Sequence, residues 1–343
     1  MNSAAALHID YVSLEDIRLR PQGWWQDILG AICFGGAAEP PEAAFQDVPL
    51  AQVGAPVLAA QPGIVELWRV RGPKQSGRHG RVRYRRHGEL LFACLQIAEH
   101  EFLPGGAEPC GDTLWHATAA AYRELFEALG ALGQAHPVRI WNFMPHINGA
   151  TACGERYFHF NDARQSAFLG AQRSVAGNVP AASALGLPAS NPLTVYCIAA
   201  ARAPIALENP RQRSAWEYPS QYGPTSPTFA RACIESGSGE TLFISGTASI
   251  VGHATTHAGD ARAQTLETVR NIRAVVDAAN ARVAPARYAV ERLRYKVYVR
   301  RAEDLNAIDS QLRGQIGHAA PVLYVQADIC RGDLLLEIEA VGF

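Results

Sequence analysis

The sequence has almost no excess of either charge and no long hydrophobic run. Its 343 residues include 31 lysines and arginines against 32 aspartates and glutamates, a formal net charge of -1. Such a balance gives no general attraction for the phosphates of nucleic acid, so we expect no nucleic-acid partner. No apolar run reaches the ~20 residues that a membrane-spanning helix needs, so we expect no membrane segment. Small molecules are therefore the expected ligands.

The sequence also lacks the motifs of metal sites, nucleotide sites and secretion signals. Its seven cysteines have no CxxC pair, and their odd number and wide spacing predict free thiols. His253 and His257 lie four residues apart without a third ligand at zinc spacing, so we expect no metal. The sequence has no GxGxxG or Walker motif, so we expect no cofactor. The N-terminus lacks a basic segment followed by an apolar one, which favours a cytoplasmic location.

Residues 1–60 are rich in alanine, glycine and proline, and the stretch AAEPPEAAF interrupts any long helix or strand. We therefore predict an irregular N-terminal wrap for this part. Between residues 63 and 101, β-branched and aromatic residues predict three successive strands. The basic run among them, RGPKQSGRHGRVRYRRHG, is typical of a solvated edge hairpin that discourages pairing with other sheets.

The same order of elements then occurs twice. Apolar side chains at three- and four-residue spacing predict an amphipathic helix over 112–132, followed by a strand, a second helix and another strand. After a link at 208–229, rich in proline, glycine and tyrosine, strands and a helix over 263–281 repeat this order. The two leading helices begin about 150 residues apart, a period typical of a duplicated domain. We predict an α+β fold of two tandem units, a degenerate one at 61–215 and a second at 216–343, with sheets covered by helices and a site in the cleft between them.

Four motifs of the second unit carry a family resemblance. They are LFISGTAS, QTLETVRNIRAVVDAA, YKVYVRRAEDLNAID and LLLEIEAVGF. In this order they resemble the reactive-intermediate deaminases, the RidA/YjgF-like family. The resemblance implies a chorismate-mutase-like βα sandwich with ligand sites in the clefts between subunits. A tandem copy forms such a cleft within one chain, so a monomer with pseudo-oligomeric packing is feasible.

The whole chain resembles a narrower family, the chorismatases or hydroxybenzoate synthases. The matching stretches are RIWNFMPHIN, GERYFHFNDARQSAF, ENPRQRSAWEYPSQYGPTSPTFARA and ICRGDLLLEIEA. This resemblance implies a lyase that cleaves chorismate to pyruvate and 3-hydroxybenzoate, with 4-hydroxybenzoate as a competing product. An ungapped alignment places Val322 where the deaminases carry a carboxylate-binding arginine, which disfavours imine hydrolysis.

The last strand supplies the expected catalytic acid. Alternation along LLLEIEA places Glu337 and Glu339 on one face and apolar residues on the other. A carboxyl group in apolar surroundings keeps its proton near neutral pH, so Glu337 could protonate the enolpyruvyl ether, whereas Glu339 is expected to be structural. The resemblance implies a second catalytic residue, Cys330, whose thiol opens an epoxide-like intermediate before the ring aromatises.

Six residues are candidates for substrate binding. Tyr157 and Arg164 are two helical turns apart and so share a face, where an arginine fork and a hydroxyl would suit a carboxylate. Further candidates are Arg202, after a strand, and Tyr222, in the link. Gly246 and Ala248 of SGTAS are small residues that would let a ring approach the backbone.

Three other functions remain open at this point. A hydrolytic chorismatase would give 3,4-dihydroxycyclohexa-1,5-diene carboxylate without needing the thiol. A RidA-like imine deaminase and a non-catalytic ligand-binding protein are the other two alternatives.

Overall fold

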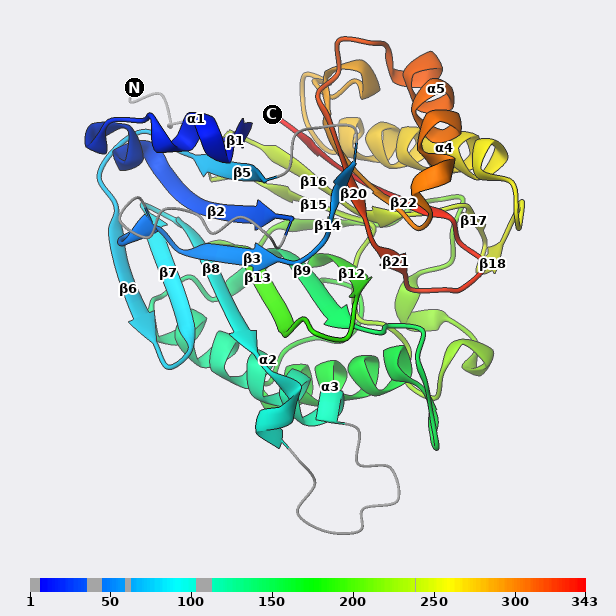
Figure 1. Cartoon of the computed structure of the whole chain (residues 1–343), viewed down its shortest axis with the longest axis horizontal. Helices are drawn as coiled ribbons and strands as arrows, with labels where there is room; N and C mark the ends of the chain where they lie inside the picture. Colours follow the sequence, from blue (N-terminus) through cyan, green and yellow to red (C-terminus); the bar gives the residue numbers. More distant parts are fainter. Residues whose placement is uncertain (1–6, 36–44, 59–62, 103–112, 238) are drawn as a thin grey trace.

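The computed structural model describes residues 7–35, 45–58, 63–102, 113–237 and 239–343. They form two seven-stranded sheets, a four-stranded sheet and two short hairpins (Figure 1). Asp112, expected to begin the first helix, and Cys110 lie outside the described residues. No helix within these ranges is both long enough and apolar enough to cross a membrane. Short 3-10 helices are η1 (Gln22–Asp27), η3 (Glu99–Phe102), η4 (Ala215–Glu217), η5 (Ser220–Tyr222), η6 (Val290–Arg292) and η7 (Ala302–Asp304).

The N-terminal segment is not an irregular wrap, so this prediction is wrong. Together with residues 64–69 it forms a sheet of order β1-β5-β2-β3, with a short helix beside it. The elements are β1 (His8–Ser13), α1 (Leu14–Arg18), β2 (Ile28–Phe34), β3 (Leu50–Val53) and β5 (Ile64–Arg69). Every residue of β2 is buried, because both faces of this strand are covered. Gly30 permits this packing, since a side chain there would overlap the ring of Phe92.

The two large sheets have the same topology, which confirms two tandem units. The first has the order β21-β12-β9-β13-β8-β7-β6 and the second β14-β15-β16-β22-β19-β20-β4. When the order of the second sheet is reversed, each of its strands corresponds to one strand of the first. Each sheet contains one parallel pair of strands, β9 with β12 in the first and β19 with β20 in the second. The strands of the first are β6 (Gln75–His79), β7 (Val82–His87), β8 (Leu90–Ile97), β9 (His136–Pro145), β12 (Ala181–Leu187), β13 (Leu193–Ala200) and β21 (Asp328–Ile329). Those of the second are β4 (Val57–Leu58), β14 (Ile205–Leu207), β15 (Ala232–Glu235), β16 (Thr241–Thr247), β19 (Arg294–Val299), β20 (Val322–Gln326) and β22 (Leu336–Gly342).

Each sheet borrows its seventh strand from another part of the chain. β21 follows β20 in sequence but pairs with β12 of the first sheet. β4 comes from the N-terminal segment and pairs with β20 of the second sheet. The basic hairpin strand β6 forms the outer edge of the first sheet, as predicted, and most of its side chains are exposed.

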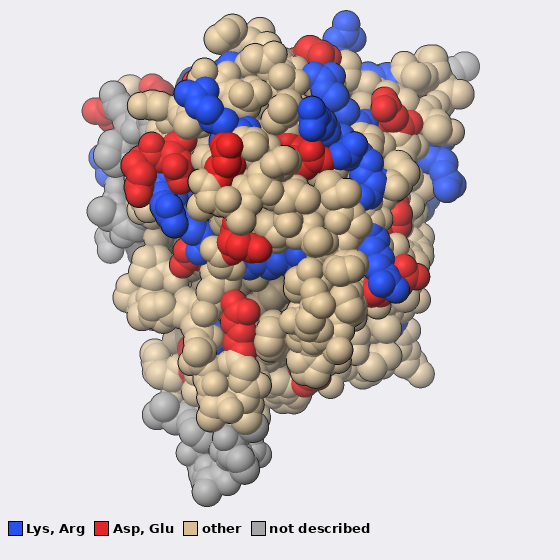
Figure 2. All heavy atoms as spheres, turned by 90° about the vertical axis from the view of Figure 1, so that its right-hand side faces the viewer, with Lys and Arg blue, Asp and Glu red and all other residues tan. Residues whose placement is uncertain are grey.

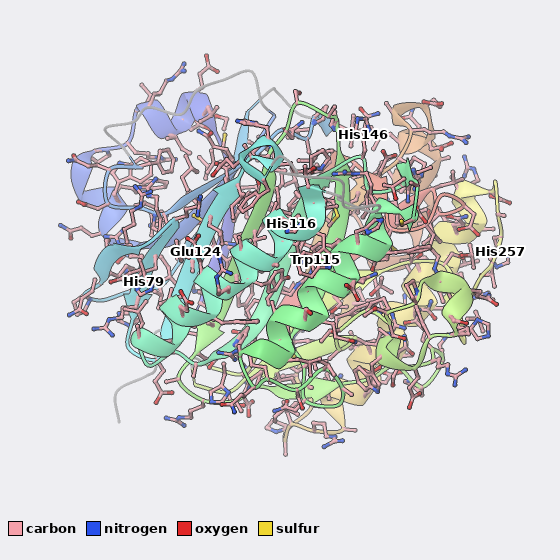
Figure 3. The ribbon with its side chains drawn as sticks, turned by 90° about the horizontal axis from the view of Figure 1, so that it is seen from below. His79, Trp115, His116, Glu124, His146 and His257 are labelled. Carbon is pink, nitrogen blue, oxygen red and sulfur yellow. The ribbon has the colours of Figure 1, made fainter. Side chains whose placement is uncertain are left out.

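Helices cover one face of each large sheet, as predicted. Beneath the first sheet lie α2 (Thr113–Ala131) and α3 (Arg156–Gly170), side by side in the view from below (Figure 3). Trp115 of α2 donates a hydrogen bond of 2.8 Å to Asp162 of α3. The second sheet carries α4 (Ala261–Asn280) and α5 (Leu305–Ile316).

The opposite faces of the sheets meet in a central core. Rings from three sheets stack there, with Trp68 of β5 lying 5.7 Å from Trp141 of β9 and 5.8 Å from Phe243 of β16, centroid to centroid. This core holds the two units and the N-terminal sheet together. On the face shown in Figure 2, acidic and basic side chains are interspersed.

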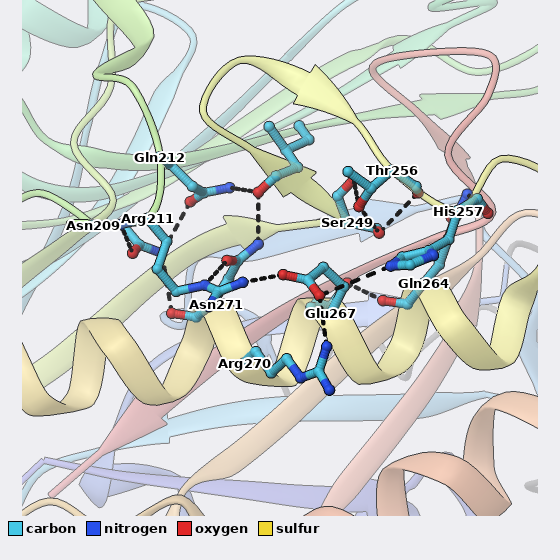
Figure 4. A network of polar contacts seen from close by, with 12 residues as sticks. Asn209, Arg211, Gln212, Ser249, Thr256, His257, Gln264, Glu267, Arg270 and Asn271 are labelled. Atoms are coloured by element: carbon cyan, nitrogen blue, oxygen red, sulfur yellow. Dashed lines mark hydrogen bonds and ion pairs between the residues drawn. The ribbon is translucent and has the colours of Figure 1, made fainter.

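A polar network on α4 fixes the beginning of the link between the units (Figure 4). The buried carboxylate of Glu267 pairs with Arg211 of the link and lies 3.1 Å from Arg270. Asn271 donates to the carbonyls of Ala248 and Ile250 at 3.0 and 2.9 Å. These bonds hold the link and the end of β16 on one helix, beside the short hairpin β17 (Ile250–Val251) and β18 (Ala254–Thr255).

One cysteine differs from the prediction of free thiols. Cys153 is disulfide-bonded and lies beside the exposed hairpin β10 (Ala150–Thr151) and β11 (Gly154–Glu155). Five others are free thiols: Cys33, Cys94, Cys197, Cys233 and Cys330. Spacing along the chain could not reveal this bond, because the fold decides which cysteines approach each other.

Candidate active site

A cavity of about 260 Å³ lies between the two units. The first unit contributes residues of α3 and β12, and the second contributes the end of β16, the turn at 330–333 and Glu337 of β22. The link closes it with Tyr218 and Tyr222. A site in the cleft between units was expected, and seven of the eight predicted site residues line this cavity.

Glu337 brings a buried carboxyl group to the cavity. It is only 4% exposed, and among the described residues its Oε1 has no hydrogen-bond partner. Its pKa is raised from 4.5 to about 8, mainly by burial and also by the nearby charge of Glu339, against the opposing effect of Arg139. Neighbouring Ile338 faces the helix-covered core, as the predicted alternation requires. The carboxyl group can therefore hold a proton at neutral pH.

Gly246 explains how a carboxyl group fits at this position. A side chain here would overlap Glu337 Oε1 and would also approach Ser183 Oγ. The Gly246 N–H donates to Ser183 Oγ at 3.1 Å. Gly246 thus makes room for Glu337 on one wall, and the small side chain of Ala248 continues the same wall.

Cys330 lies on the turn after β21 and is a free, partly buried thiol. Burial raises its pKa to about 12, and the carboxyl group of Glu337 contributes in the same direction. The thiol therefore keeps its proton at neutral pH. Its chemistry in this cavity starts from a neutral S–H group rather than from a thiolate.

Arg164 and Tyr157 come together on the cavity-facing side of α3, as their spacing predicted. Arg164 Nε donates to the hydroxyl of Tyr122 at 2.6 Å, and Nη1 donates to the carbonyl of Thr228. Its Nη2 is buried and has no partner in the described ranges. Burial and the nearby Cys330 hold the pKa of Tyr157 well above its usual value, so this hydroxyl is a neutral donor. The pair offers a cation and a hydroxyl to an anionic ligand.

Tyr222 lines the cavity, but Arg202 does not. The Arg331 guanidinium stacks on the Tyr222 ring at 3.8 Å, and the Tyr222 hydroxyl lies 3.3 Å from His253 Nδ1. Arg202 is on the surface with 69% of its side chain exposed, where it pairs with Glu89 at 2.8 Å. The prediction for Arg202 is therefore wrong, because this side chain follows β13 on the surface and does not line the cavity.

Two arginines of the cavity were not predicted. Arg331 donates to the His253 carbonyl at 2.8 Å, and Arg231 donates to the Tyr218 hydroxyl at 2.8 Å. Each keeps one buried guanidinium nitrogen, Nη2 of Arg331 and Nε of Arg231, without a partner among the residues described. The position of Arg331 directly after Cys330 was a usable signal. Arg231 directly precedes the buried strand β15, and only the fold brings it to the cavity.

Several known proteins are similar to this chain in sequence or in structure. The family model "Chorismatase FkbO/Hyg5-like, N-terminal" matches residues 66–199. A 3-hydroxybenzoate synthase of Streptomyces hygroscopicus is 33% identical over 326 residues, which cover 92% of each protein. The chain belongs to the chorismatase family. A chorismatase of Streptomyces rapamycinicus is 37% identical over 284 residues, which cover 80% of this chain and 81% of that protein.

The fold agrees with that of a solved member of the family. A chorismatase crystal structure superposes with a TM-score of 0.85 and 28% identity, and the match covers 100% of both chains. The predicted chorismatase resemblance and the predicted fold class are thus confirmed. The two tandem units described above are the chorismatase architecture.

Proposed function

We propose that this protein is a lyase that cleaves chorismate to pyruvate and 3-hydroxybenzoate. One observation carries the proposal: the carboxyl group of Glu337 and the thiol of Cys330 line the same cavity between the units, where burial raises the pKa of each group. The two relatives named 3-hydroxybenzoate synthase and chorismatase support the choice of substrate.

The reaction begins with proton transfer from Glu337 to carbon. Protonation of the enolpyruvyl methylene gives an oxocarbenium ion, and a positioned acid is what this step lacks in water. The neighbouring ring hydroxyl then attacks the ring carbon that bears the ether oxygen. The C–O bond breaks, its electron pair forms the carbonyl of pyruvate, and the hydroxyl proton returns to the Glu337 carboxylate.

Cys330 directs the epoxide-like intermediate toward an aromatic product. Its sulfur adds to the ring while its proton passes to the opening epoxide oxygen. The sulfur leaves as the ring loses a proton, which restores the thiol. Pyruvate and 3-hydroxybenzoate together contain every atom of chorismate, so this route consumes no water. A protonated thiol suits this ring-opening step, because the epoxide oxygen must receive a proton as its C–O bond breaks.

The substrate carries two carboxylates, and the cavity offers arginines from both units. Arg164 on α3, with the hydroxyl of Tyr157, would hold one carboxylate through charge-assisted bonds. Arg331 and Arg231, which border the link, would hold the other with Tyr222. Each of the three has an unpartnered buried nitrogen in the part of the chain that the structure describes.

Purified protein incubated with chorismate tests the proposal. We expect release of pyruvate together with 3-hydroxybenzoate, with 4-hydroxybenzoate as a minor product, separated by chromatography. Release of pyruvate with only the dihydroxycyclohexadiene carboxylate would instead identify a hydrolytic chorismatase. Absence of pyruvate would reject chorismate cleavage.

Three expectations from the sequence stay predictions: a cytoplasmic location, a monomeric state and unit boundaries at 61–215 and 216–343. Sedimentation of the purified protein would test the second. The imine deaminase is disfavoured because Val322 lies on β20, where it packs against the apolar core of the second unit.

A further inference from the structure

Four buried charged side chains form an alternating row beneath the cavity. Lys296 Nζ lies 2.7 Å from Glu66 Oε2 and 2.9 Å from Glu339 Oε1. Arg139 Nη2 lies 2.7 Å from Glu339 Oε2. The side chains are 1–5% exposed and come from four strands, β5, β19, β22 and β9. The row contains two anions and two cations, so its charges balance.

Hydrogen bonds complete the environment of both carboxylates in the row. Trp68 Nε1 donates to Glu66 at 2.9 Å, and Trp141 Nε1 donates to Glu339 at 2.8 Å. Burial raises the pKa of Glu66, and Lys296 with the Trp68 N–H opposes this rise. Burial would also raise the pKa of Glu339, but Lys296 and Arg139 bring it below its usual value. Glu339 is thus a buried anion with both oxygens occupied.

Glu337 is two residues from Glu339 on the same strand face but outside the row. Ser183 Oγ, near Gly246 on this wall, donates to Glu339 at 3.0 Å. The other titratable or charged groups around Glu337 come from four elements. They are Tyr157 and Arg164 of α3, Cys330 and Arg331 of the turn, Arg139 of β9, and Tyr298 of β19.

We propose that Glu339 is a positioning residue that keeps Glu337 protonated by engaging Arg139, the cation that would otherwise stabilise an ionised Glu337. The anion also repels a second negative charge two residues away. Glu66, from the N-terminal sheet, balances the remaining charge of Lys296. This inference rests on the proposed function, since it concerns the acid of that reaction.

Substitution of Glu339 by Gln tests the inference through the pH dependence of kcat. The acid form of Glu337 is the active one, so activity falls as pH rises through its pKa. Glu339→Gln leaves Arg139 without its carboxylate and removes the repelling charge. We expect the midpoint of the alkaline limb to move down by about one pH unit or more.

A double variant separates charge from structure. Glu339→Gln with Arg139→Gln removes the anion and the freed cation together, so the midpoint should return toward that of the wild type. A purely structural defect would be worsened by the second change. Glu267→Gln is the matched control, because Glu267 is an equally buried, arginine-paired carboxylate on α4. It should lower the melting temperature and leave the midpoint unchanged.

The outcomes distinguish this inference from the proposed function. An active wild type with the same alkaline midpoint in Glu339→Gln would overturn the inference and leave the function intact. A wild type that releases no pyruvate at any pH would overturn the function itself. If Glu339→Gln does not fold, Glu66→Gln replaces it. Its midpoint should move in the same direction by a smaller amount, and an unmoved midpoint would contradict the inference.

Discussion

The two units share a topology but differ in what they bring to the cavity. β13 and β22 occupy the same place in their sheets, yet β13 presents Tyr196 to the central core where β22 presents Glu337 and Glu339. The first unit instead contributes Arg164 and Tyr157 through α3. In the proposed function, the duplicated scaffold thus separates the acid, in one copy, from an arginine that would bind a substrate carboxylate, in the other.

The largest effect should come from removing the acid of the second unit. Glu337→Gln keeps the shape of the side chain but supplies no acidic proton, so we expect kcat for pyruvate release to fall by about 10²–10⁴-fold. Chorismate binding, measured by calorimetry, should remain within a few-fold of the wild type. Full activity in this variant would show that the second unit does not supply the acid.

A second prediction concerns the first unit. Arg164→Gln removes a charge-assisted contact worth about 1.5–3 kcal/mol, so KM for chorismate should rise by roughly 10–100-fold. Arg202→Gln is the matched control, because Arg202 was a further substrate-binding candidate from sequence and lies on the surface. If both variants kept the wild-type KM, the assignment of substrate binding to α3 would be wrong.

The third prediction changes the product rather than the rate. Cys330→Ala leaves Glu337 in place, so pyruvate release should continue within about tenfold of the wild-type rate. The fraction of 3-hydroxybenzoate among the products, measured by chromatography, should fall sharply. Cys197→Ala is the control, since Cys197 is a fully buried free thiol outside the cavity. An unchanged product ratio in Cys330→Ala would favour the hydrolytic alternative.

The smallest effect concerns stability. The folded protein holds the Glu337 proton up to a pH of about 8, whereas the unfolded chain releases it near the usual value of 4.5. The unfolded state therefore binds fewer protons in this window, and the free energy of unfolding falls as pH rises, at most by about 1.4 kcal/mol per pH unit. Glu337→Gln should lack this loss, so its urea midpoint should exceed that of the wild type at pH 8. Parallel pH profiles for the two proteins would contradict a protonated Glu337.

Much of the fold was predictable because its periodic elements are long. The helices at 113–131 and 261–280 and the strand of Glu337 follow local patterns that packing reinforces. The N-terminal sheet was missed because its glycines and alanines, read as breakers, permit close packing against β8. β12 was missed because AASALGL has no alternation, as expected for a parallel strand covered on both faces.

Site residues could be predicted where a family motif fixed the alignment of the sequence. Outside these motifs, fewer of them could be predicted. Glu337 and Cys330 belong to one short motif, and Tyr157 and Arg164 share a helix face. Arg231 and Lys296 could not be found in this way, because their roles depend on contacts between strands far apart in the sequence. Arg202 was misplaced for the same reason.

The exchanged strands have a consequence for any attempt to divide the chain. A fragment ending at residue 215 would lose β21, and a fragment starting at 216 would lose β4 and β14, so each would expose unpaired strand edges. Such halves would be prone to aggregate when produced separately. When the two fragments are mixed, each could supply the strands that the other lacks. Recovered enzymatic activity would then show that the fragments had reassembled.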